Sequence, residues 1–520
     1  MKKTGMGGQG LARGKISAVA VAAWLLVACG GGGEEDAASL RASAAGAASC
    51  ANRVNNTFEK LLECVTLDGV RRHQAALQSI ADLHNGIRTS GTPGYDASVA
   101  YAAEVLRQAG YQVTVTDFQF QTFITLSGTV LEQVAPGPAG PLANNIMEYS
   151  GSTDVTAAVT ALAAPPADPT PGCEAADFAG FPAGNIALIS RGGCTFATKA
   201  ANAHAAGAAG AVIYNNTAGD LNGTLGEAFA LDIGVTSVTQ ALGAQLAATP
   251  GLVLRLKTDT FRGQATTSNI IAESTAGDPN NVVMVGAHLD SVNEGPGIND
   301  NGSGTAAILE TAVQMAKVKP RNRLRFALWG AEESGLVGST NYVNGLSQAE
   351  KDRIALYLNF DMIGSPNHVF FVYDGDDSDA TGEGPGPGGS DQIEKAFEAF
   401  YTQRGVPFKG TDFDGRSDYR AFIQNQIPAG GLFTGAEGVK TAAEAAAWGG
   451  TAGQAYDPCY HLACDTYANN NDAALDINAD AVAYTTLLFS MNTSTVNGLR
   501  GKGNFRMPAL KPLHPVPASN

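Results

Sequence analysis

The sequence predicts an α/β fold built on an open sheet, with a second domain inserted into it. Three apolar runs, at residues 282–285, 324–329 and 355–358, are typical of buried strands. Each run is followed within a few residues by histidine, aspartate or glutamate, and strand ends are where open α/β sheets present ligand-handling groups. The stretch from residue 124 to residue 262 is rich in alanine, glycine and threonine and poor in charge, which indicates the inserted domain.

The chain begins with a segment typical of exported bacterial proteins. Residues 1–29 combine a positively charged start with an apolar core that is too short to span a membrane. The letters LVAC at residues 26–29 resemble a bacterial lipobox, in which Cys29 becomes the lipidated first residue. We therefore expect a lipid anchor at the cell envelope; the alternative is an ordinary secretory signal cleaved nearby. Residues 30–49 are rich in glycine, alanine and serine and predict a flexible tether.

The cysteine count also favours export. The chain has 7 cysteines, and an even number remains once Cys29 is set aside for lipid. Such a set predicts disulfides in an exported protein, although spacing alone does not fix which cysteines pair. The near pairs are Cys50 with Cys64, Cys173 with Cys194, and Cys459 with Cys464.

The net charge of the chain limits the kinds of molecule that it is expected to bind. The formal net charge is −16 at pH 7, which argues against nucleic acid as a partner. An acidic balance of this kind is usually only a solvated exterior. The length of 520 residues allows two domains and a large core.

The elements around the insert follow ordinary periodicities. Helical spacing predicts helices over residues 66–83 and 96–108, the second entered from a Thr-Pro-Gly turn. Alternation of apolar and polar residues predicts a strand over residues 112–122, and residues 269–272 resume that pattern after the insert. Residues 305–317 again have helical spacing.

Five side chains that can bind metal lie at strand ends or in loops. His288 follows the first apolar run, and Asp300 comes about a dozen residues later in a glycine-rich loop. Glu333 and Asp361 follow the second and third runs, and His461 lies far downstream between two cysteines. These residue types suit a pair of zinc ions, because imidazole and carboxylate both bind zinc and one carboxylate can bridge. The alternative for the first two residues alone is a structural histidine and an Asx turn.

The insert has a signature of its own. Residues 185–196 read NIALISRGGCTF and residues 206–216 read AGAAGAVIYNN, a pattern that predicts strand, turn, small-residue helix and strand. This stretch resembles the protease-associated (PA) domain. The resemblance implies a non-catalytic, β-rich module at residues 124–262 that covers or gates a substrate site.

The rest of the chain resembles the di-zinc aminopeptidases of peptidase family M28. The resemblance implies a three-layer α/β/α domain with a mixed, mostly parallel sheet, formed by residues 50–123 and 263–492 and followed by a tail at residues 493–520. The matching segments are 286–310, 326–339, 357–365, 415–419, 430–438 and 448–466.

The resemblance also assigns roles to the metal-capable residues. It implies that His288 and Asp361 bind one zinc ion, that Glu333 and His461 bind the other, and that Asp300 bridges both. In the family the peptide bond after the bridging aspartate is cis, here Asp300-Asn301.

Further roles follow from the same resemblance. Glu332 is expected to be the general base, and Asp290 is expected to orient the imidazole of His288. Tyr460 is expected to donate a hydrogen bond to the oxyanion, with a packing tyrosine as the alternative. Arg416 matches a substrate-binding position, or else forms a structural ion pair with Asp414 or Asp418.

A calcium site is a further possibility that the resemblance raises. Asp476 and Asp480 match its spacing in some members, but the partner position near Cys64 lacks the expected aspartate. The alternative is an acidic cluster at a helix N-terminus.

The predicted function is the release of N-terminal, preferably apolar, amino acids from peptides that have a free N-terminus, by a monomeric enzyme. The alternatives are another activity on the same scaffold, such as a carboxypeptidase or a glutaminyl cyclase, and a non-catalytic protein that binds peptides.

Overall fold

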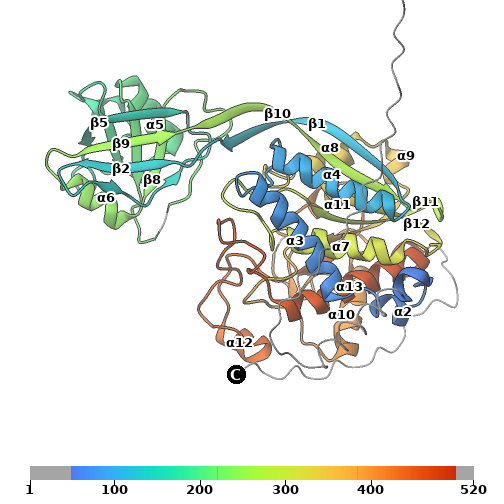
Figure 1. The fold of residues 1–520 in the computed structure, drawn as a ribbon. Coiled ribbons are helices and arrows are strands. Elements are labelled where there is room, and N and C mark those ends of the chain that lie inside the picture. The colour runs from blue at the N-terminus through green and yellow to red at the C-terminus, as the bar shows by residue number, and fades with distance from the viewer. Residues whose placement is uncertain (1–48, 220, 383, 499–520) are drawn as a thin grey trace, which may run out of the picture. The chain divides into compact units, whose positions relative to one another are not determined.

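The computed structural model describes residues 49–219, 221–382 and 384–498 (Figure 1). The signal segment, Cys29, nearly all of the tether and residues 499–520 of the tail lie outside the described residues. Two sheets of eight strands dominate the described part, and the predicted α/β fold class is confirmed. None of the helices in this part combines enough length with enough apolar character to span a membrane.

The first sheet has the strand order β1-β10-β12-β11-β13-β16-β14-β15. Its centre is parallel, from β12 through β11 and β13 to β16, and antiparallel pairs flank that centre, so the sheet is mixed as expected. Its strands are β1 (Gln112–Thr125), β10 (Thr260–Glu273), β11 (Asp278–His288), β12 (Asn322–Trp329), β13 (Ile354–Phe360), β14 (Phe371–Tyr373), β15 (Lys409–Thr411) and β16 (Ala429–Phe433).

The central strands are buried on both faces, which explains why they read as continuous apolar runs. Along β11, Val283 and Val285 pack into the larger core, whereas Val282 and Met284 pack into a second core on the opposite face. Side chains of successive strand residues point to opposite faces, so one short run supplies both cores. The second core is aromatic, and it includes Trp329.

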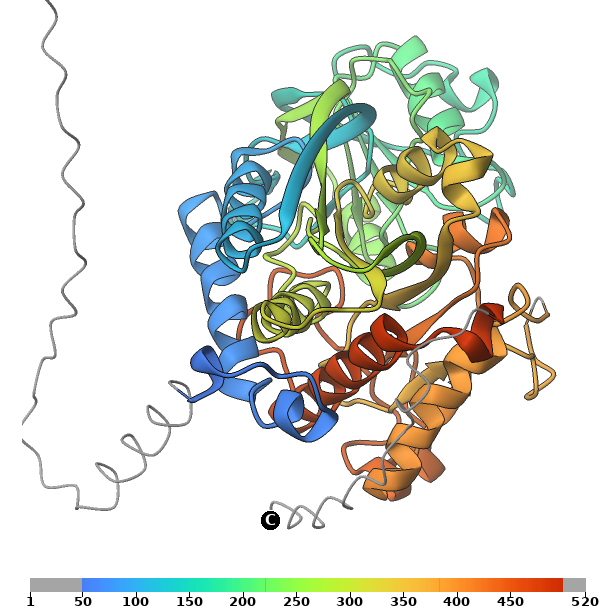
Figure 2. The ribbon, with the colours of Figure 1, turned by 90° about the vertical axis from the view of Figure 1, so that its right-hand side faces the viewer.

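Helices cover both faces of this sheet. The larger core takes side chains from α3, α4, α7, α10 and α13, and Figure 2 shows α10 and α13 side by side. The second core takes side chains from α8 and α11. The helices are α2 (Phe58–Leu62), α3 (Leu67–Leu83), α4 (Pro93–Gln108), α7 (Gly302–Met315), α8 (Val337–Gly345), α9 (Gln348–Lys351), α10 (Ser390–Arg404), α11 (Tyr419–Gln424), α12 (Ala442–Trp448), α13 (Asp472–Met491) and α14 (Ser494–Asn497).

Two helices begin three residues earlier than the periodicity predicts. Helix α4 begins at Pro93, because Thr92 is extended and proline suits the first helical position, so the Thr-Pro-Gly turn becomes the first helical turn. Helix α7 begins at Gly302, because the side chain of Asn301 caps it by accepting a hydrogen bond from Gly304 N–H. In the segment assigned to the tail, α14 follows Thr493, which is buried.

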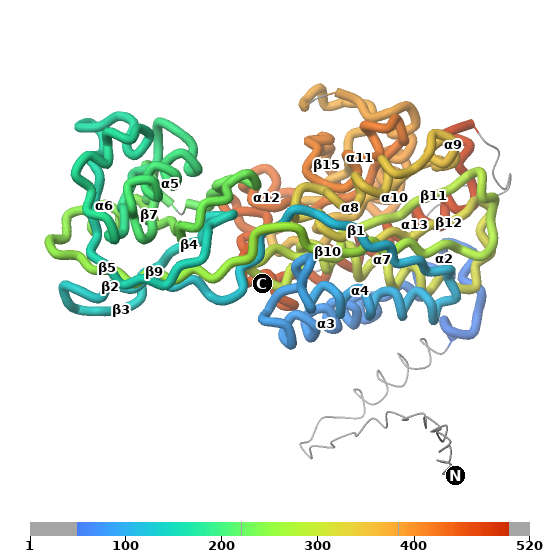
Figure 3. The backbone as a smooth tube through the Cα atoms, turned by 90° about the horizontal axis from the view of Figure 1, so that it is seen from above, coloured from blue at the N-terminus to red at the C-terminus, as the bar shows by residue number. Residues whose placement is uncertain are grey.

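Strands β1 and β10 pair along their whole length, with Gln112 opposite Glu273 and Thr125 opposite Thr260, as Figure 3 shows. The chain leaves the first sheet at the end of β1 and returns to it at the start of β10. The insert therefore lies between two residues that face each other across one ladder.

The insert has its own mixed sheet and its own cores. The strand–helix–strand unit expected there is present as β6, α5 and β7, with Thr195 as the N-cap of α5. The elements are β2 (Val130–Ala135), β3 (Gly140–Pro141), β4 (Asn145–Ile146), β5 (Thr153–Ala161), β6 (Ile186–Ser190), α5 (Phe196–Ala205), β7 (Gly210–Tyr214), β8 (Val235–Val238), α6 (Gln240–Ala247) and β9 (Val253–Thr258), with a short 3-10 helix at Ala175–Phe178.

Three disulfides join near neighbours in the sequence. They are Cys50–Cys64, Cys173–Cys194 and Cys459–Cys464.

Candidate metal centre and cleft

The metal-capable side chains meet at one edge of the first sheet. His288 is the last residue of β11, Glu332 and Glu333 follow the end of β12, and Asp361 follows the end of β13. These three strands are parallel neighbours, so their carboxyl ends lie at the same edge. Asp300 joins them from the loop that leads into α7.

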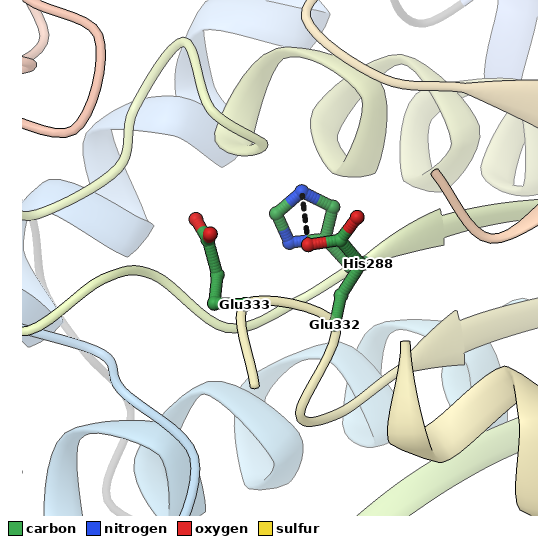
Figure 4. A group of neighbouring side chains, drawn as sticks. All are labelled: His288, Glu332 and Glu333. Carbon is green, nitrogen blue, oxygen red and sulfur yellow. Dashed lines mark ion pairs between the residues drawn. The ribbon is translucent and has the colours of Figure 1, made fainter. Parts of the chain in front are cut away.

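His288 is the centre of the first group of ligand atoms. Its Nε2 lies 3.1 Å from Asp300 Oδ1, 3.3 Å from Asp361 Oδ1 and 4.0 Å from Glu332 Oε2. Figure 4 shows the carboxylate of Glu332 beside the ring of His288. On the other side of the ring, Nδ1 lies 3.2 Å from the backbone carbonyl of Asp290 and 3.6 Å from its carboxylate. The carbonyl is therefore the closer partner, and the carboxylate is beyond hydrogen-bond distance.

His461 is the centre of a second group. Its Nε2 lies 3.2 Å from Asp300 Oδ2 and 3.1 Å from Glu333 Oε2. The side chain of His461 is 39% exposed, whereas that of Asp300 is 7% exposed, so the group opens to solvent on the side of His461. Asp300 thus presents one carboxylate oxygen to each histidine.

The donor set suits metal ions. The ligand atoms of His288, Asp300 and Asp361 lie within 4.8 Å of one another, and so do those of Asp300, Glu333 and His461. A third grouping, of His288, Glu332 and Glu333, shares members with both and uses the same space. Two buried oxygens in the cluster, Glu333 Oε1 and Asp361 Oδ1, have no hydrogen-bond partner, as expected of atoms that bind a cation.

The charges of the cluster favour bound positive charge. Burial lowers the pKa of His461, but Glu333 and Asp300 more than offset this and raise it to about 12. Burial also raises the pKa of Glu332 well above its usual value and that of Glu333 to about 7. The pKa of Asp300 is lowered despite burial, because both histidines donate to its carboxylate.

Three residues in or next to the cluster have left-handed backbone. Ala331, Met362 and His461 have φ angles of 53°, 52° and 56°. Non-glycine residues rarely adopt this region, and where they do they often mark functional sites. The Asp300-Asn301 peptide bond is cis, as expected.

His461 and the carboxylates of the cluster line a cleft of about 550 Å³. Tyr460 and Arg416 also line it, and Arg416 Nη2 donates to Tyr460 Oη over 3.2 Å. Burial raises the pKa of Tyr460. Apolar and aromatic residues also line the cleft, among them Met362, Phe371, Phe433 and Tyr456.

The expected ion-pair alternatives for Arg416 are wrong in their partners. Its guanidinium pairs with Glu437 at 2.8 Å, not with Asp414 or Asp418. Asp414 instead accepts from the backbone N–H of Arg416. Asp418 is buried, and burial raises its pKa to about 7.

The two candidate calcium ligands, Asp476 and Asp480, lie on α13. Asp480 Oδ2 accepts from Arg404 Nη2 over 2.6 Å, so a cationic side chain already neutralises this carboxylate. Asp476 and Asp480 belong to none of the metal-capable groups among the described residues. Calcium binding here stays a prediction.

Two buried aspartates that the sequence analysis did not identify connect the histidine loop to the aspartate loop. Asp465 accepts from the backbone N–H groups of Asn299 and Asp300, at 2.8 Å and 3.0 Å. Asp457 accepts from the side-chain amide of Asn299 over 2.7 Å. They flank the disulfide loop that carries His461, and this position is the signal that could have identified them.

Comparisons with known proteins identify the family of the chain. Peptidase family M28 matches residues 269–486, and the PA domain matches residues 155–246. An aminopeptidase of Pseudomonas aeruginosa is 50% identical over 453 residues, covering 84% of this chain and 83% of the relative. A probable lipoprotein aminopeptidase, LpqL, of Mycobacterium tuberculosis is 43% identical and covers 84% of this chain and 87% of that protein.

Solved structures show the same architecture. The aminopeptidase from Aneurinibacillus sp. strain AM-1 matches with a TM-score of 0.58 and 27% identity, covering 88% of this chain and all of that one. The zinc aminopeptidase BSAP from Bacillus subtilis matches with a TM-score of 0.58 and 25% identity, covering 81% and 94%. The clustered carboxylates and histidines and these relatives lead to one conclusion: the chain belongs to peptidase family M28, as a metal-dependent aminopeptidase with a PA domain.

Proposed function

We propose that this enzyme releases apolar N-terminal residues from peptides with the help of two zinc ions. His288 and Asp361 would hold one ion, Glu333 and His461 would hold the other, and Asp300 would bridge them. The observation that carries the proposal is the orientation of Asp300, whose two carboxylate oxygens face two different histidines at 3.1 Å and 3.2 Å. The choice of zinc is supported by the mixed imidazole and carboxylate donors and by the zinc aminopeptidase from Bacillus subtilis.

Zinc ions bound here would supply Lewis acidity, which lowers the pKa of a water molecule and polarises a carbonyl oxygen. The chain's own residues then handle the protons. Glu332 lies beside the ligands but belongs to neither of the two ligand groups, and its carboxylate is 8% exposed. We assign it the role of general base, which takes a proton from the attacking water and returns it to the leaving amine.

Tyr460 is suited to stabilise an oxyanion. Its hydroxyl oxygen already accepts a hydrogen bond from Arg416, so its own proton is left to be donated into the cleft. Arg416 in turn is held by Glu437, which receives two hydrogen bonds at 2.8 Å and 3.3 Å. We therefore assign Tyr460 as the hydrogen-bond donor to the oxyanion and Arg416 as the residue that holds it.

The cleft combines negative charge with an apolar side. The carboxylates of Glu332 and Asp361, which line the cleft, favour a cationic α-amine. The aromatic rings of Phe371 and Tyr456 pack at 5.5 Å between centroids and line the same cleft, which suits an apolar side chain. A free N-terminus with an apolar first residue matches both features.

We expect hydrolysis of leucine p-nitroanilide and no measurable hydrolysis of its N-acetylated form. Acetylation removes the positive charge that the carboxylates attract and adds bulk where the amine would lie. Initial rates at equal concentrations, with lysine and glutamate p-nitroanilides beside them, give the comparison. Equal rates on the acetylated substrate would contradict an aminopeptidase, and activity only on C-terminal residues or N-terminal glutamine would favour a carboxypeptidase or a glutaminyl cyclase.

The disulfide Cys459–Cys464 is expected to contribute little to metal binding. It closes a loop with a sequence separation of 5, and such a short loop stabilises by only about 2 kcal/mol. Asp457 and Asp465 hold the same loop without it. We expect the variant with serine at both cysteines to keep its zinc content and most of its turnover, with a lower Tm.

The matched control for that variant is serine at Cys173 and Cys194, the disulfide of the insert. Zinc content is measured by atomic emission, and turnover on leucine p-nitroanilide. Loss of zinc from the Cys459/Cys464 variant alone would show that the disulfide, not the aspartates, positions His461.

For the whole protein we propose a monomer tethered to the cell envelope by lipid on Cys29. The proposal is supported by the LVAC segment and by the relative named a probable lipoprotein in Mycobacterium tuberculosis. We divide the chain into a peptidase domain at residues 50–123 and 263–492 and a PA domain at residues 124–262. Metabolic labelling with a fatty acid tests the anchor, with Cys29→Ala as the control. Label retained in this variant would contradict lipidation of Cys29.

A further inference from the structure

A short segment between α3 and α4 contacts both loops of the candidate metal centre. It consists of Arg88, Thr89 and Ser90, which are 0%, 5% and 0% exposed. We call these three residues the strap. Arg88 is the one buried arginine among the described residues, and no role in the proposed chemistry uses it.

Arg88 joins the two ends of the loop between His288 and Asp300. Its guanidinium donates to the backbone carbonyls of Leu289, Pro296 and Gly297, the last two at 2.8 Å and 2.7 Å. Leu289 follows His288 directly, and Pro296 and Gly297 lie just before Asp300 in the chain. One planar side chain with donors in fixed directions therefore sets the distance between the two ends.

Arg88 also keeps a positive charge inside the protein. All three acceptors of its guanidinium are carbonyls, so no hydrogen-bonded carboxylate neutralises it. Burial lowers the pKa of Arg88 to about 10, while Asp290, Asp465 and Asp300 raise it, so the side chain stays charged at neutral pH.

Gly297 lets the loop approach this closely. Its φ angle is +62°, and a Cβ atom there would clash with the carbonyl oxygen of Asp300 and lie 3.3 Å from Arg88 Nη2. A side chain at this position would push apart the groups that Arg88 holds together.

The other end of the strap holds the loop of the general base. Ser90 Oγ accepts from the backbone N–H of Ala331 over 2.7 Å, and it also accepts from Thr267 Oγ1 over 3.0 Å. Ala331 has left-handed backbone and directly precedes Glu332. Between the two ends, Thr89 Oγ1 donates to the carbonyl of Val292 over 2.8 Å.

We propose that the strap is a positioning element with two separable tasks. Arg88 sets the geometry of His288 and Asp300 and so controls metal affinity. Ser90 sets the position of Glu332 and so controls turnover without affecting metal affinity. The inference rests on the proposed roles of His288 and Asp300 in metal binding and of Glu332 in proton transfer.

The first task is tested by zinc affinity in Arg88→Lys and Arg88→Met, measured on the folded mature chain against a chromogenic chelator. Lysine keeps the charge but cannot reach three carbonyls at once, and methionine removes both charge and donors. We expect zinc affinity to fall roughly 10–100-fold in both, with a larger loss for methionine, and the absorption spectrum of the cobalt-loaded protein to change. Arg107→Lys, an exposed arginine on α4, is the control and should match the parent.

The result that overturns this task is a folded Arg88→Lys with the zinc affinity and cobalt spectrum of the parent. If Arg88→Met does not fold, Arg88→Lys decides alone. The zinc content of the parent distinguishes a failure of the two-ion proposal from a failure of the role assigned to Arg88. A parent that binds a single ion refutes the two-ion proposal, but the comparison with Arg88→Lys can still be read on that ion.

The second task is tested by Ser90→Ala. We expect kcat to fall roughly tenfold or more, with KM, zinc affinity and the cobalt spectrum as in the parent. An unchanged kcat would overturn the task, and so would a loss of zinc equal to that in Arg88→Lys, because a merely structural role affects both. Should Ser90→Ala fail to fold, Thr267→Val, which removes the hydroxyl that donates to Ser90, decides by the same criteria.

Discussion

Glu332→Gln is expected to lower kcat by about two to four orders of magnitude while the zinc content stays that of the parent. The carboxylate lies 4.0 Å from the ring of His288 but is not required by either ligand group, so the amide leaves the donor atoms in place. Its backbone N–H also remains anchored by Asp290 Oδ1 at 3.3 Å. What the change removes is the group that accepts and returns the proton. Turnover of leucine p-nitroanilide and metal analysis on the same sample give the two numbers.

Glu104→Gln is the matched control for this experiment. Glu104 is exposed on α4, far along the chain from the cleft-lining residues, and its replacement makes the same chemical change. We expect its kcat and KM to equal those of the parent. A Glu332→Gln enzyme with near-parental turnover would remove Glu332 from the mechanism, and one that has lost its zinc would make Glu332 a ligand.

Asp300→Asn is expected to abolish activity and to lower the zinc content below one ion per chain. Asp300 contacts both histidines, and an amide has one oxygen and no charge, so each of the two proposed ions would lose a ligand. Chelation of the parent should give the same inactive state. Because Asp300 and Glu332 are buried, removing the cations leaves the negative charge of the cluster uncompensated, and Tm should fall by several degrees.

Asp82→Asn, an exposed aspartate on α3, controls for the loss of one negative charge. Metal content and Tm are followed together, before and after chelation and after zinc is added back. Full activity in verified metal-free protein would end the metal-dependent mechanism. Retention of two zinc ions by Asp300→Asn would leave the mechanism but remove the bridge.

The sequence predicted the edge of the sheet where the cluster of metal-capable side chains lies, because the strands that lead to these side chains are buried on both faces. Such strands read as apolar runs, and the polar residue that follows each run must lie at the end of a strand. The order of β12, β11 and β13 could not be read from the sequence, since parallel neighbours are joined by long crossovers that leave no local signal of adjacency.

The residues that position the ligands were missed for a different reason. Arg88 binds backbone carbonyls about 200 residues away in the chain, and every residue has a carbonyl, so no partner type reveals the contact. Asp465 likewise accepts from backbone N–H groups. The alternative considered for Arg416 was an ion pair with the nearest acidic residues in the sequence, but its guanidinium pairs with Glu437, 21 residues further along the chain. Side-chain identity therefore predicts metal-capable residues better than it predicts the residues that position them.

The long ladder of β1 and β10 bears on how this architecture arises. Thr125 and Thr260 are partners, so everything between them takes the topological place of a hairpin turn. Antiparallel partners lie only about 5 Å apart, so a module whose own ends are equally close can be exchanged there without altering a single strand register of the sheet. The catalytic scaffold can therefore gain, lose or replace an accessory domain as one cassette while its chemistry is conserved.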